Sequence, residues 1–504
     1  MLHAFLTILV FAVSLLVWWV RKTFTFWSDK GIAYLTFWQY MRFVYDIITK
    51  PFSEVVLSNY KRYGRLYGSY QGTVPTLVVA DPEILRDIFV TKFHNFSDRS
   101  ASQHIGSDVW KKSILNLSGD EWRKARNVFT PALTTVRLRT IVIKIKTVAE
   151  RLATCIVDAA SKNKPVNFGE LVHHTALDIT AALNYSIDLD SRNEPNHALI
   201  KCLDGIFMTA AGWKVLMLFL MPNVYKVLQP DYPTEASTDV FKAFVSHLIE
   251  ERKAQNKEED DFLQVFMNAD YDWEEAGDKK SNNSEKKRMS LDEITAQGIV
   301  SFVGGVESTT TNVAVTTYYL ALNPECQERA IAEVDKALSE GDITYDALQE
   351  MPYIDACIKE GLRLCTPDST MFRLCTEETT VAGIRFQPGM CIEIPMQAIH
   401  HDPEHYPDPE KFNPERFLPE NKDSVRPFTY LPFGAGPRNC AGMRLGMVQV
   451  KATLVSLLRH VRFEACPETM IPLKFKPCQF VPDFDGPLLL RAMLRNPATN
   501  KDAL

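Results

Sequence analysis

One cysteine of this chain lies in a glycine-rich loop beside an arginine. The segment from Phe433 to Gly442 reads Phe-Gly-Ala-Gly-Pro-Arg-Asn-Cys-Ala-Gly, which places the thiol at Cys440. Glycines lack a Cβ and accept positive φ, so this backbone can approach a flat ligand closely. Arg438 supplies a fixed positive charge that favours a thiolate and can bind a carboxylate. These residues suit a thiolate ligand to a haem iron, which favours O–O cleavage. The competing interpretation is a structural cysteine in a surface loop.

Four further short motifs precede this loop. They are Trp122-x-x-x-Arg126, Gly304-Gly-Val-Glu-Ser-Thr309, Glu360-x-x-Arg363 and Pro414-Glu-Arg-Phe417. Each motif is weak alone, but together with the cysteine loop their order along the chain resembles that of the cytochrome P450 family of haem-thiolate monooxygenases. The resemblance covers nearly the whole chain after its N-terminal segment. It is nearest the microsomal clan that contains vertebrate drug-metabolising and arthropod detoxifying enzymes.

The resemblance implies a haem b cofactor whose axial ligand is the thiolate of Cys440. Haem carries two propionates, which need cationic and hydrogen-bonding partners. By motif position, the predicted cofactor-binding residues are Trp122, Arg126, Arg373, Phe433, Gly436, Arg438 and Gly442. Three more residues are expected to form a buried ion network that serves haem incorporation and not turnover, namely Glu360, Arg363 and Arg416.

Proton delivery is the second requirement of O–O cleavage, and it must proceed while bulk water is excluded. A carboxylate beside a hydroxyl can pass protons through ordered water. Glu307 and Ser308 stand at the acid–alcohol positions of the family motif, where most members carry threonine in place of the serine. A serine hydroxyl lacks the methyl group that restricts its rotamer. We therefore predict working but less tightly coupled oxygen activation, or a partly displaced role for Thr309. The neighbouring pair Gly304 and Gly305 has close helix–helix packing as its alternative explanation.

Substrate contacts are predicted from position in the family. The apolar stretch from Ile206 to Met221 resembles the family's variable roof over the active site, and a buried ordinary helix is the alternative. If this stretch is the roof, substrates are lipophilic and enter from the bilayer. The predicted substrate contacts are Ile105, Phe302, Gly305, Ser369, Thr370 and Phe480.

Composition fits a large globular domain with no nucleic-acid role. Of the 504 residues, 46% are hydrophobic and 23% charged, and the formal net charge of −6 gives no argument for binding nucleic acid. The ten cysteines include no C-x-x-C pair, so neither a zinc site nor a thioredoxin-like motif is indicated.

Helix signals dominate the chain, which predicts a mainly α fold with a small β portion. The clearest helix opens at the capping box Ser290 to Glu293 and should end near Leu322, before Asn323 and Pro324. Strand-like runs cover residues 76–79 and the region 380–394. Residues 250–288 are charged and rich in serine and asparagine, and indicate a solvated segment with one short amphipathic helix at 262–266.

The N-terminus carries the signals of a membrane anchor. Residues 2–20 are almost wholly apolar, about the length needed to cross a bilayer, and Arg21 and Lys22 follow directly. We expect a single uncleaved transmembrane helix that leaves the rest of the chain on the cytosolic side of the endoplasmic reticulum membrane. Residues 21–50 then form an aromatic-rich linker, suited to a membrane interface or to the core, and residues 51–504 the haem-thiolate catalytic domain.

Electrons must come from another protein. No G-x-G-x-x-G follows a predicted strand, so a dinucleotide site is not indicated. The resemblance implies an NADPH-dependent flavoprotein reductase as partner, with a microsomal b-type cytochrome as a second candidate. The residues predicted to contact the reductase are the basic residues Arg123, Lys124 and Arg444, for which a solvated surface is the alternative.

The function predicted from these residues is insertion of one oxygen atom from O2 into a lipophilic small molecule. One alternative is a haem-thiolate isomerase or dehydratase that acts on hydroperoxides without a reductase. The other is a non-catalytic haem-binding sensor or scaffold. Glu307 and Ser308 argue against both alternatives, because neither needs a paired proton relay.

Overall fold

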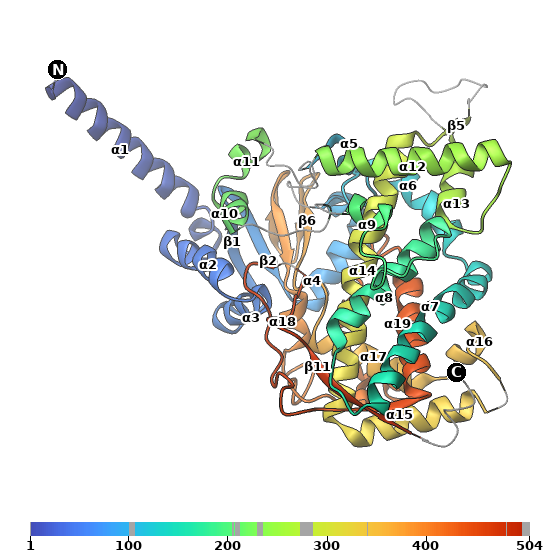
Figure 1. Cartoon of the computed structure of the whole chain (residues 1–504). Coiled ribbons are helices and arrows are strands. Elements are labelled where there is room, and N and C mark those ends of the chain that lie inside the picture. The colour runs from blue at the N-terminus through green and yellow to red at the C-terminus, as the bar shows by residue number, and fades with distance from the viewer. Residues whose placement is uncertain are drawn as a thin grey trace.

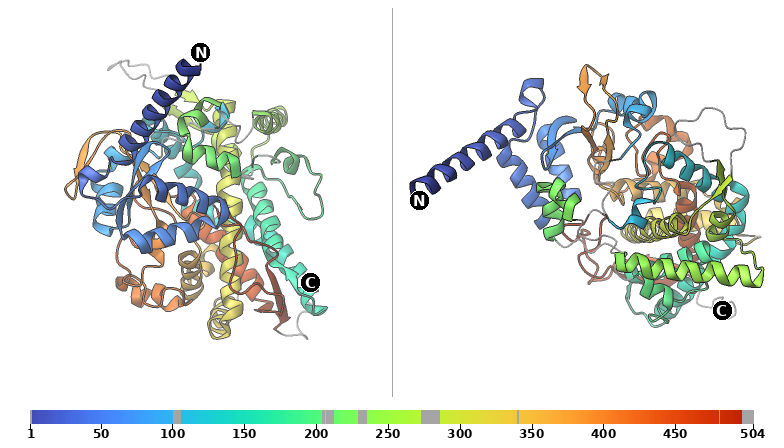
Figure 2. Two further views of the ribbon diagram at one scale, coloured as in Figure 1. Left: turned by 90° about the vertical axis from the view of Figure 1, so that its left-hand side faces the viewer. Right: turned by 90° about the horizontal axis from the view of Figure 1, so that it is seen from above.

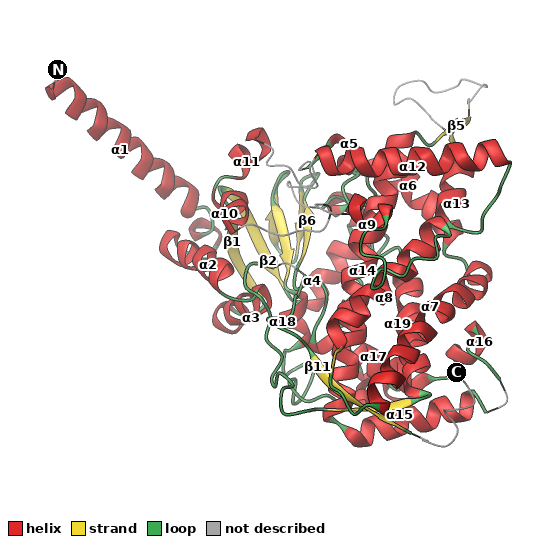
Figure 3. Cartoon of the chain, in the orientation of Figure 1, coloured by secondary structure: helices red, strands yellow, loops and turns green. Residues whose placement is uncertain are grey.

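The computed structural model describes residues 2–99, 106–203, 206, 212–228, 235–272, 286–339, 341–479 and 481–495. The chain is mainly helical with small sheets, as the sequence predicts (Figure 3). The helices lie mostly on one side of the molecule and the largest sheet on the other (Figure 1).

The helices are α1 (Leu2–Phe24), α2 (Phe37–Thr49), α3 (Phe52–Tyr63), α4 (Pro82–Arg86), α5 (Asp108–Lys111), α6 (Gly119–Ala132), α7 (Thr135–Ser161), α8 (Phe168–Tyr185), α9 (Ala198–Leu203), α10 (Gly212–Leu220), α11 (Pro222–Leu228), α12 (Glu235–Gln255), α13 (Phe262–Asn268), α14 (Leu291–Leu322), α15 (Pro324–Ala337), α16 (Tyr345–Gln349), α17 (Pro352–Leu364), α18 (Met396–His400) and α19 (Met443–Leu458). The strands are β1 (Leu66–Gln71), β2 (Val74–Val79), β3 (Val166–Asn167), β4 (Asp270–Asp272), β5 (Lys286–Arg288), β6 (Met371–Leu374), β7 (Thr379–Val381), β8 (Ile384–Phe386), β9 (Cys391–Ile394), β10 (Val461–Glu464) and β11 (Leu489–Leu494). Short 3-10 turns include η5 (Pro414–Phe417) and η6 (Pro419–Ser424).

The long helix α14 runs through the middle of the helical part and packs against α8, α17 and α19 (Figure 1). Its predicted start is confirmed, because Ser290 Oγ accepts from Glu293 N–H at 3.3 Å and Glu293 Oε2 accepts from Ser290 N–H at 2.7 Å. This reciprocal capping box satisfies two N–H groups that a helix start leaves without partners. The predicted end is also confirmed, since the helix stops at Leu322 and α15 begins at Pro324.

The main sheet has the strand order β1-β2-β9-β6, in which only the pair β2 and β9 is parallel. Its residues belong to a second hydrophobic cluster that also includes α2 and α3. A smaller sheet, β10-β11-β3, closes the far end of the helical part. The short helix predicted at 262–266 corresponds to α13, and residues 273–285 of the charged segment lie outside the described residues.

The N-terminal helix α1 projects away from the rest of the molecule (Figures 1 and 2). Within the part of the chain that the structure describes, no helix combines the length and the apolar character that a membrane span requires. Some aromatic side chains of the segment that follows are buried and others are exposed. Trp27 and Tyr40 are buried, at 0% and 1% exposure, whereas Trp38 is 79% and Tyr45 56% exposed.

Candidate functional site

The cysteine loop is held in a fixed shape directly before α19. Cys440 N–H donates to Phe433 O at 2.8 Å, which closes the loop on itself. Gly434 and Gly436 have φ of 68° and 71°, in the left-handed region that favours glycine. A Cβ on Gly436 would lie 2.1 Å from the Phe89 carbonyl oxygen, so the loop packs backbone to backbone there.

The thiol of Cys440 is accessible, unlike the buried side chains of most other cysteines in the described chain. Burial of the loop by surrounding protein raises the pKa of Cys440, while the N–H of Gly442 and the positive charge of Arg99 lower it. These two contacts, with the charge of Arg126, offset part of that rise and favour the thiolate, which is the form that ligates metals.

Arginines converge on the side of this loop. Arg438 donates through Nη1 to Ser97 O at 2.7 Å and through Nη2 to Leu117 O, and its guanidinium lies 5.0 Å from the Trp122 ring centroid. Arg373, on β6, is fully buried and donates to Phe372 O at 2.9 Å. Arg126, on α6, donates to both oxygens of Asn439. The structure therefore brings Trp122, Arg126, Arg373 and Arg438 together around the cysteine loop.

A fourth arginine, Arg99, joins this group. Its charge acts on Cys440, on Arg373 and on Arg438, so it lies among all three. Arg99 belongs to no motif of the sequence, and a single arginine in a loop offers little signal. The one available hint was its place directly after Asp98, shortly before the Trp122 helix.

The arginine cluster carries more positive charge than its acidic neighbours balance. Burial, then the charges of Arg99 and Arg438, hold the pKa of Arg373 well below its usual range. Burial, then Arg99, lowers the pKa of Arg438 to about 9. Several buried guanidinium nitrogens have no hydrogen-bond partner among the described residues: Arg99 Nε, Arg373 Nε, Arg373 Nη2 and Arg438 Nε.

Such a cluster fits a ligand that carries two negative charges and several acceptor oxygens. The nearest acids balance the cluster only in part, since Asp98 pairs with Arg438 at 3.5 Å and burial raises the pKa of Asp368. The two propionates of a haem have the required charge. The accessible Cys440 thiol and the glycine backbone beside it fit the same ligand, so the residues present agree with the haem predicted from the sequence.

The predicted ion network is assembled on α17. Arg363 donates to both carboxylate oxygens of Glu360, at 2.7 and 2.8 Å, and both side chains are fully buried. Arg416 Nε lies 3.5 Å from Glu360 Oε1, which also accepts from Asn413 N–H at 2.9 Å. Arg363 further donates to His400 O at 2.8 Å. The network thus ties α17 to the segment that contains η5.

The three residues of the predicted proton relay lie in the middle of α14. Ser308 Oγ donates to Gly304 O at 2.6 Å, in the preceding turn. Thr309 is buried, and its Oγ1 donates to Gln449 Oε1 of α19 at 3.4 Å. Burial, followed by the charge of Asp483, raises the pKa of Glu307, and Lys476 lowers it. A carboxyl group with a raised pKa holds its proton to a higher pH than a free glutamate does.

Space is open beside the glycine pair of α14. No described atom lies within 4 Å of a Cβ built on Gly304, and one on Gly305 would first meet Thr180 Oγ1 at 3.6 Å. Close helix–helix packing therefore does not explain Gly304. A surface that faces open space beside a buried helix is suited to a bound ligand.

The predicted substrate contacts fall in different surroundings. Phe302 is fully buried and lies 6.1 Å, ring to ring, from both Tyr185 and Phe241, in the core between α8 and α12. Ser369 is buried, and its carbonyl accepts from Gln397 N–H at 3.0 Å. Thr370 is half-buried directly before β6. Ile105 and Phe480 lie outside the described residues.

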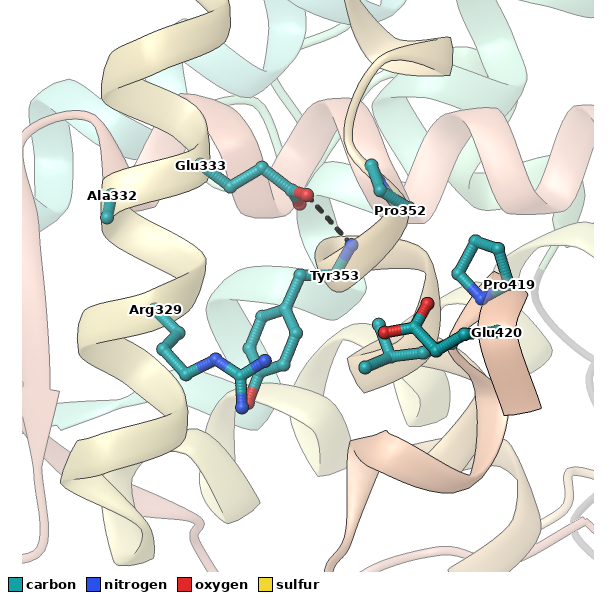
Figure 4. Close-up of a pocket in the computed structure, with 8 residues that line it drawn as sticks. Arg329, Ala332, Glu333, Pro352, Tyr353, Pro419 and Glu420 are labelled. Carbon is teal, nitrogen blue, oxygen red and sulfur yellow. Dashed lines mark hydrogen bonds between the residues drawn. The ribbon is translucent and has the colours of Figure 1, made fainter.

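A separate surface pocket of about 360 Å³ lies between α15, α17 and η6 (Figure 4). Glu333 accepts there from the N–H groups of Tyr353 and Ile354, at 2.9 and 2.8 Å, and so caps α17. Arg329 lies 4.2 Å from the Tyr353 ring centroid and pairs with Glu415. None of the residues of the cysteine loop, the arginine cluster or α14 lines this pocket.

Three features of the site together are typical of a haem-thiolate protein. They are an accessible cysteine in a glycine loop, an arginine cluster beside it and an acid–alcohol pair on a long helix. A family model described as Cytochrome P450 matches residues 34–483, and the chain belongs to the cytochrome P450 family. The predicted resemblance is confirmed. As a member of this family the protein is a monooxygenase, and its cofactor is haem with an axial cysteine thiolate.

Curated relatives extend over most of the chain. A lithocholate 6-beta-hydroxylase of Mesocricetus auratus is 32% identical over 444 residues, which is 87% of this chain and 86% of the relative. Cytochrome P450 3A41 and cytochrome P450 3A11 of Mus musculus are each 33% identical over 422 residues, which is 82% of this chain and 82% of each relative.

Proposed function

We propose that this protein is a membrane-anchored monooxygenase that inserts one oxygen atom from O2 into a lipophilic small molecule. The observation that carries the proposal is the convergence of Cys440 with four arginines, three of which (Arg99, Arg373 and Arg438) have buried nitrogens that lack partners in the described chain. The relatives include a hydroxylase of lithocholate, a lipophilic acid, which supports the substrate class.

Each residue has a role that follows from its contacts. Cys440 would supply the thiolate ligand of the haem iron, and the guanidinium groups of Arg99, Arg126, Arg373 and Arg438, with Trp122 beside them, would hold the two propionates. When bound, the haem supplies the iron at which O2 is activated. Glu307 and Ser308 hold and pass protons toward that position, and Thr309 positions the helix through Gln449. The Glu360 network maintains the fold around the site.

Membrane attachment is supported by exposed apolar surface. On α1, Val10, Phe11 and Trp18 are 63%, 65% and 58% exposed. Helix α10, within the predicted roof, exposes Trp213 at 55%, and α11, directly after the roof, exposes Val227 at 83%. Helix α10 packs against α2 near the base of α1 (Figure 1). Large exposed apolar areas of this kind mark membrane or partner contacts. Residues 2–20 would form the anchor in the endoplasmic reticulum membrane, with Arg21 and Lys22 on the cytosolic side.

Electron supply is assigned to an NADPH-dependent flavoprotein reductase, with a microsomal b-type cytochrome as a second donor. Arg444 is exposed at the start of α19, two residues beyond the cysteine loop, and Arg123 is exposed on α6. Basic residues there would attract an acidic partner surface to the thiolate side. Arg123 also pairs with Asp120 at 2.6 Å, an exposed contact that a partner can replace at small cost.

The test is the reduced carbon-monoxide difference spectrum of membranes that contain the full chain. We expect a strongly red-shifted Soret band that is lost in Cys440→His and retained in Cys155→Ser, a half-buried cysteine of α7. With reductase, NADPH and O2, a lipophilic substrate should yield a product that carries one added oxygen. A protein without the red-shifted band, or one that turns over hydroperoxides but consumes no O2 with reductase, would contradict the proposal.

A further inference from the structure

Glu307 has a histidine neighbour that is not part of any motif. His173 Nδ1, on α8, lies 3.9 Å from Glu307 Oε1, on α14. The two side chains are 36% and 35% exposed, so both reach solvent while also meeting each other. The helices α8 and α14 pack against each other, which holds the backbones that carry these two side chains side by side (Figure 1).

An exposed ion pair stands on the outer side of these two residues. Lys476 Nζ lies 2.6 Å from Asp483 Oδ2, and both side chains are about half exposed. Both belong to the loop between β10 and β11, which contacts α14 where Thr311 Oγ1 donates to Pro482 O at 3.5 Å. The charged groups around His173 are therefore Glu307 from α14, Asp483 and Lys476 from this loop, and His174 on its own helix.

The surroundings shift the pKa values of His173 and Glu307 in opposite directions. Burial lowers the pKa of His173, and the charge of Asp483 raises it. Burial and then Asp483 raise the pKa of Glu307. A histidine and a carboxyl group whose pKa values are brought toward each other exchange a proton with little cost, which is the property of a relay.

We infer that His173 is the residue through which protons enter from solvent to Glu307, and from there reach Ser308. This inference rests on the proposed function. In each cycle the imidazole takes a proton from water at its exposed edge and passes it to the Glu307 carboxylate, which leaves neutral His173 and protonated Glu307. Protonated Glu307 then gives the proton to the Ser308 side of α14, and the carboxylate is restored.

The 3.9 Å separation is too long for a hydrogen bond, so a water that contacts both groups or a small side-chain rotation completes the transfer. The exposed fractions of both side chains leave room for that water.

The first experiment measures coupling between the two residues without turnover. Histidine NMR titration of the haem-loaded, ferrous carbon-monoxide form gives the pKa of His173 in the wild type and in Glu307→Gln. We expect the substitution to lower the pKa of His173 by about 0.5 to 1, because a carboxylate about 4 Å away favours the imidazolium. The pKa of His174, whose Nδ1 contacts Ser191 Oγ at 2.9 Å, should change less.

The second experiment measures proton supply during turnover with reductase. We expect His173→Gln to raise hydrogen peroxide released per product at least about threefold, a limited effect because water still reaches Glu307. The same variant should flatten the pH profile of product formation and enlarge the solvent deuterium isotope effect. His174→Gln, the adjacent histidine that faces Ser191, is the matched control and should behave as wild type.

A double variant separates a relay from independent effects. If His173 acts only through Glu307, the double variant that combines His173→Gln and Glu307→Gln should release no more hydrogen peroxide per product than Glu307→Gln alone. Unchanged peroxide release and pH profile in His173→Gln, with a normal carbon-monoxide band and an impaired Glu307→Gln variant, would overturn the inference and leave the proposed function intact. Loss of the carbon-monoxide band in the wild type would instead overturn the proposed function.

Discussion

Arg126 of α6 holds Asn439, the residue directly before Cys440, by two hydrogen bonds. Nη1 donates to the Asn439 main-chain oxygen at 2.9 Å and Nη2 to its side-chain oxygen at 2.8 Å. The planar guanidinium matches this pair of acceptors, which a lysine could not do. The same arginine thus fixes the cysteine loop and adds positive charge beside it.

Removal of Arg126 should therefore loosen the cysteine loop and weaken haem binding together. We expect Arg126→Ala to lose about 2 to 3 kcal/mol at this contact, and Arg126→Lys to lie between it and the wild type. Haem bound per protein after purification, and the rate of haem transfer to an apo-globin acceptor, report the effect. Arg139→Ala, an exposed arginine on α7 that pairs with Asp346, should retain the wild-type haem content. Equal haem retention in all variants would show that the loop does not depend on α6.

Gly436 is the position at which the loop is least tolerant of a side chain. Its φ of +71° is unfavourable for other residues, and a Cβ would lie 2.1 Å from Phe89 O, a backbone atom that cannot turn aside. Gly436→Ala should lower the thermal midpoint and haem content. Gly446→Ala, in α19 with no atom within 4 Å of the added Cβ, should be neutral or stabilising by about 0.5 to 1 kcal/mol. A Gly436→Ala protein as stable as wild type would mean that the loop has another accessible conformation.

Local patterns in the sequence predicted the elements that local physics determines. The capping box at Ser290 and the proline at 324 define α14 without any distant contact, and the glycines of the cysteine loop specify its backbone. The i, i+3 spacing of Glu360 and Arg363 places both on one face of a helix.

Contacts between segments far apart in the chain were not predictable in the same way. Arg99 lies near Arg373 and Arg438 only because two loops and strand β6 meet in the fold, and no spacing in the sequence indicates that. The direction of Phe302 depends on the rotation of α14 about its axis, which burial against Tyr185 and Phe241 decides. The position of Phe302 in the family motif could not predict its contact with these two rings.

Glu360 should contribute strongly to the stability of the fold. Its carboxylate accepts two bonds from Arg363 and one from Asn413 N–H in a site with no solvent. Glu360→Gln leaves the buried Arg363 charge uncompensated, at a cost of about 3 to 5 kcal/mol. Urea unfolding of the purified protein measures this cost. The control is Glu415→Gln, which removes an exposed pair with Arg329 and should change stability by less than about 0.5 kcal/mol. Equal losses of unfolding free energy in Glu360→Gln and Glu415→Gln would show that burial of the ion pair does not set the cost.

Asp178 should make stability fall as pH rises through the mildly acidic range. Burial raises its pKa to about 6, although Ser191 N–H donates to Oδ1 at 3.0 Å. Between its unfolded pKa and pH 6 the folded state binds more protons, so stability decreases with pH across that interval. Asp178→Asn, which keeps the acceptor oxygen, should stabilise the protein by up to about 2 to 3 kcal/mol at pH 7.5 and little at pH 4. Denaturant midpoints at both pH values test this, and a gain of equal size at each pH would rule out the ionisation of Asp178 as its cause.

Ser308 should limit coupling because its hydroxyl has more rotamers than a threonine hydroxyl. It donates to Gly304 O at 2.6 Å, a bond within the helix that competes with donation toward the open space beside Gly304. A threonine at this position is held by its methyl group in fewer rotamers, so Ser308→Thr should lower hydrogen peroxide released per product by about twofold, equivalent to about 0.4 kcal/mol. Ser301→Thr is the matched control, since Ser301 Oγ makes the same type of bond to Gln297 O at 2.8 Å seven residues earlier on α14. A peroxide ratio unchanged in Ser308→Thr, or lowered equally by Ser301→Thr, would show that the serine hydroxyl does not set the coupling and would move that role to Thr309.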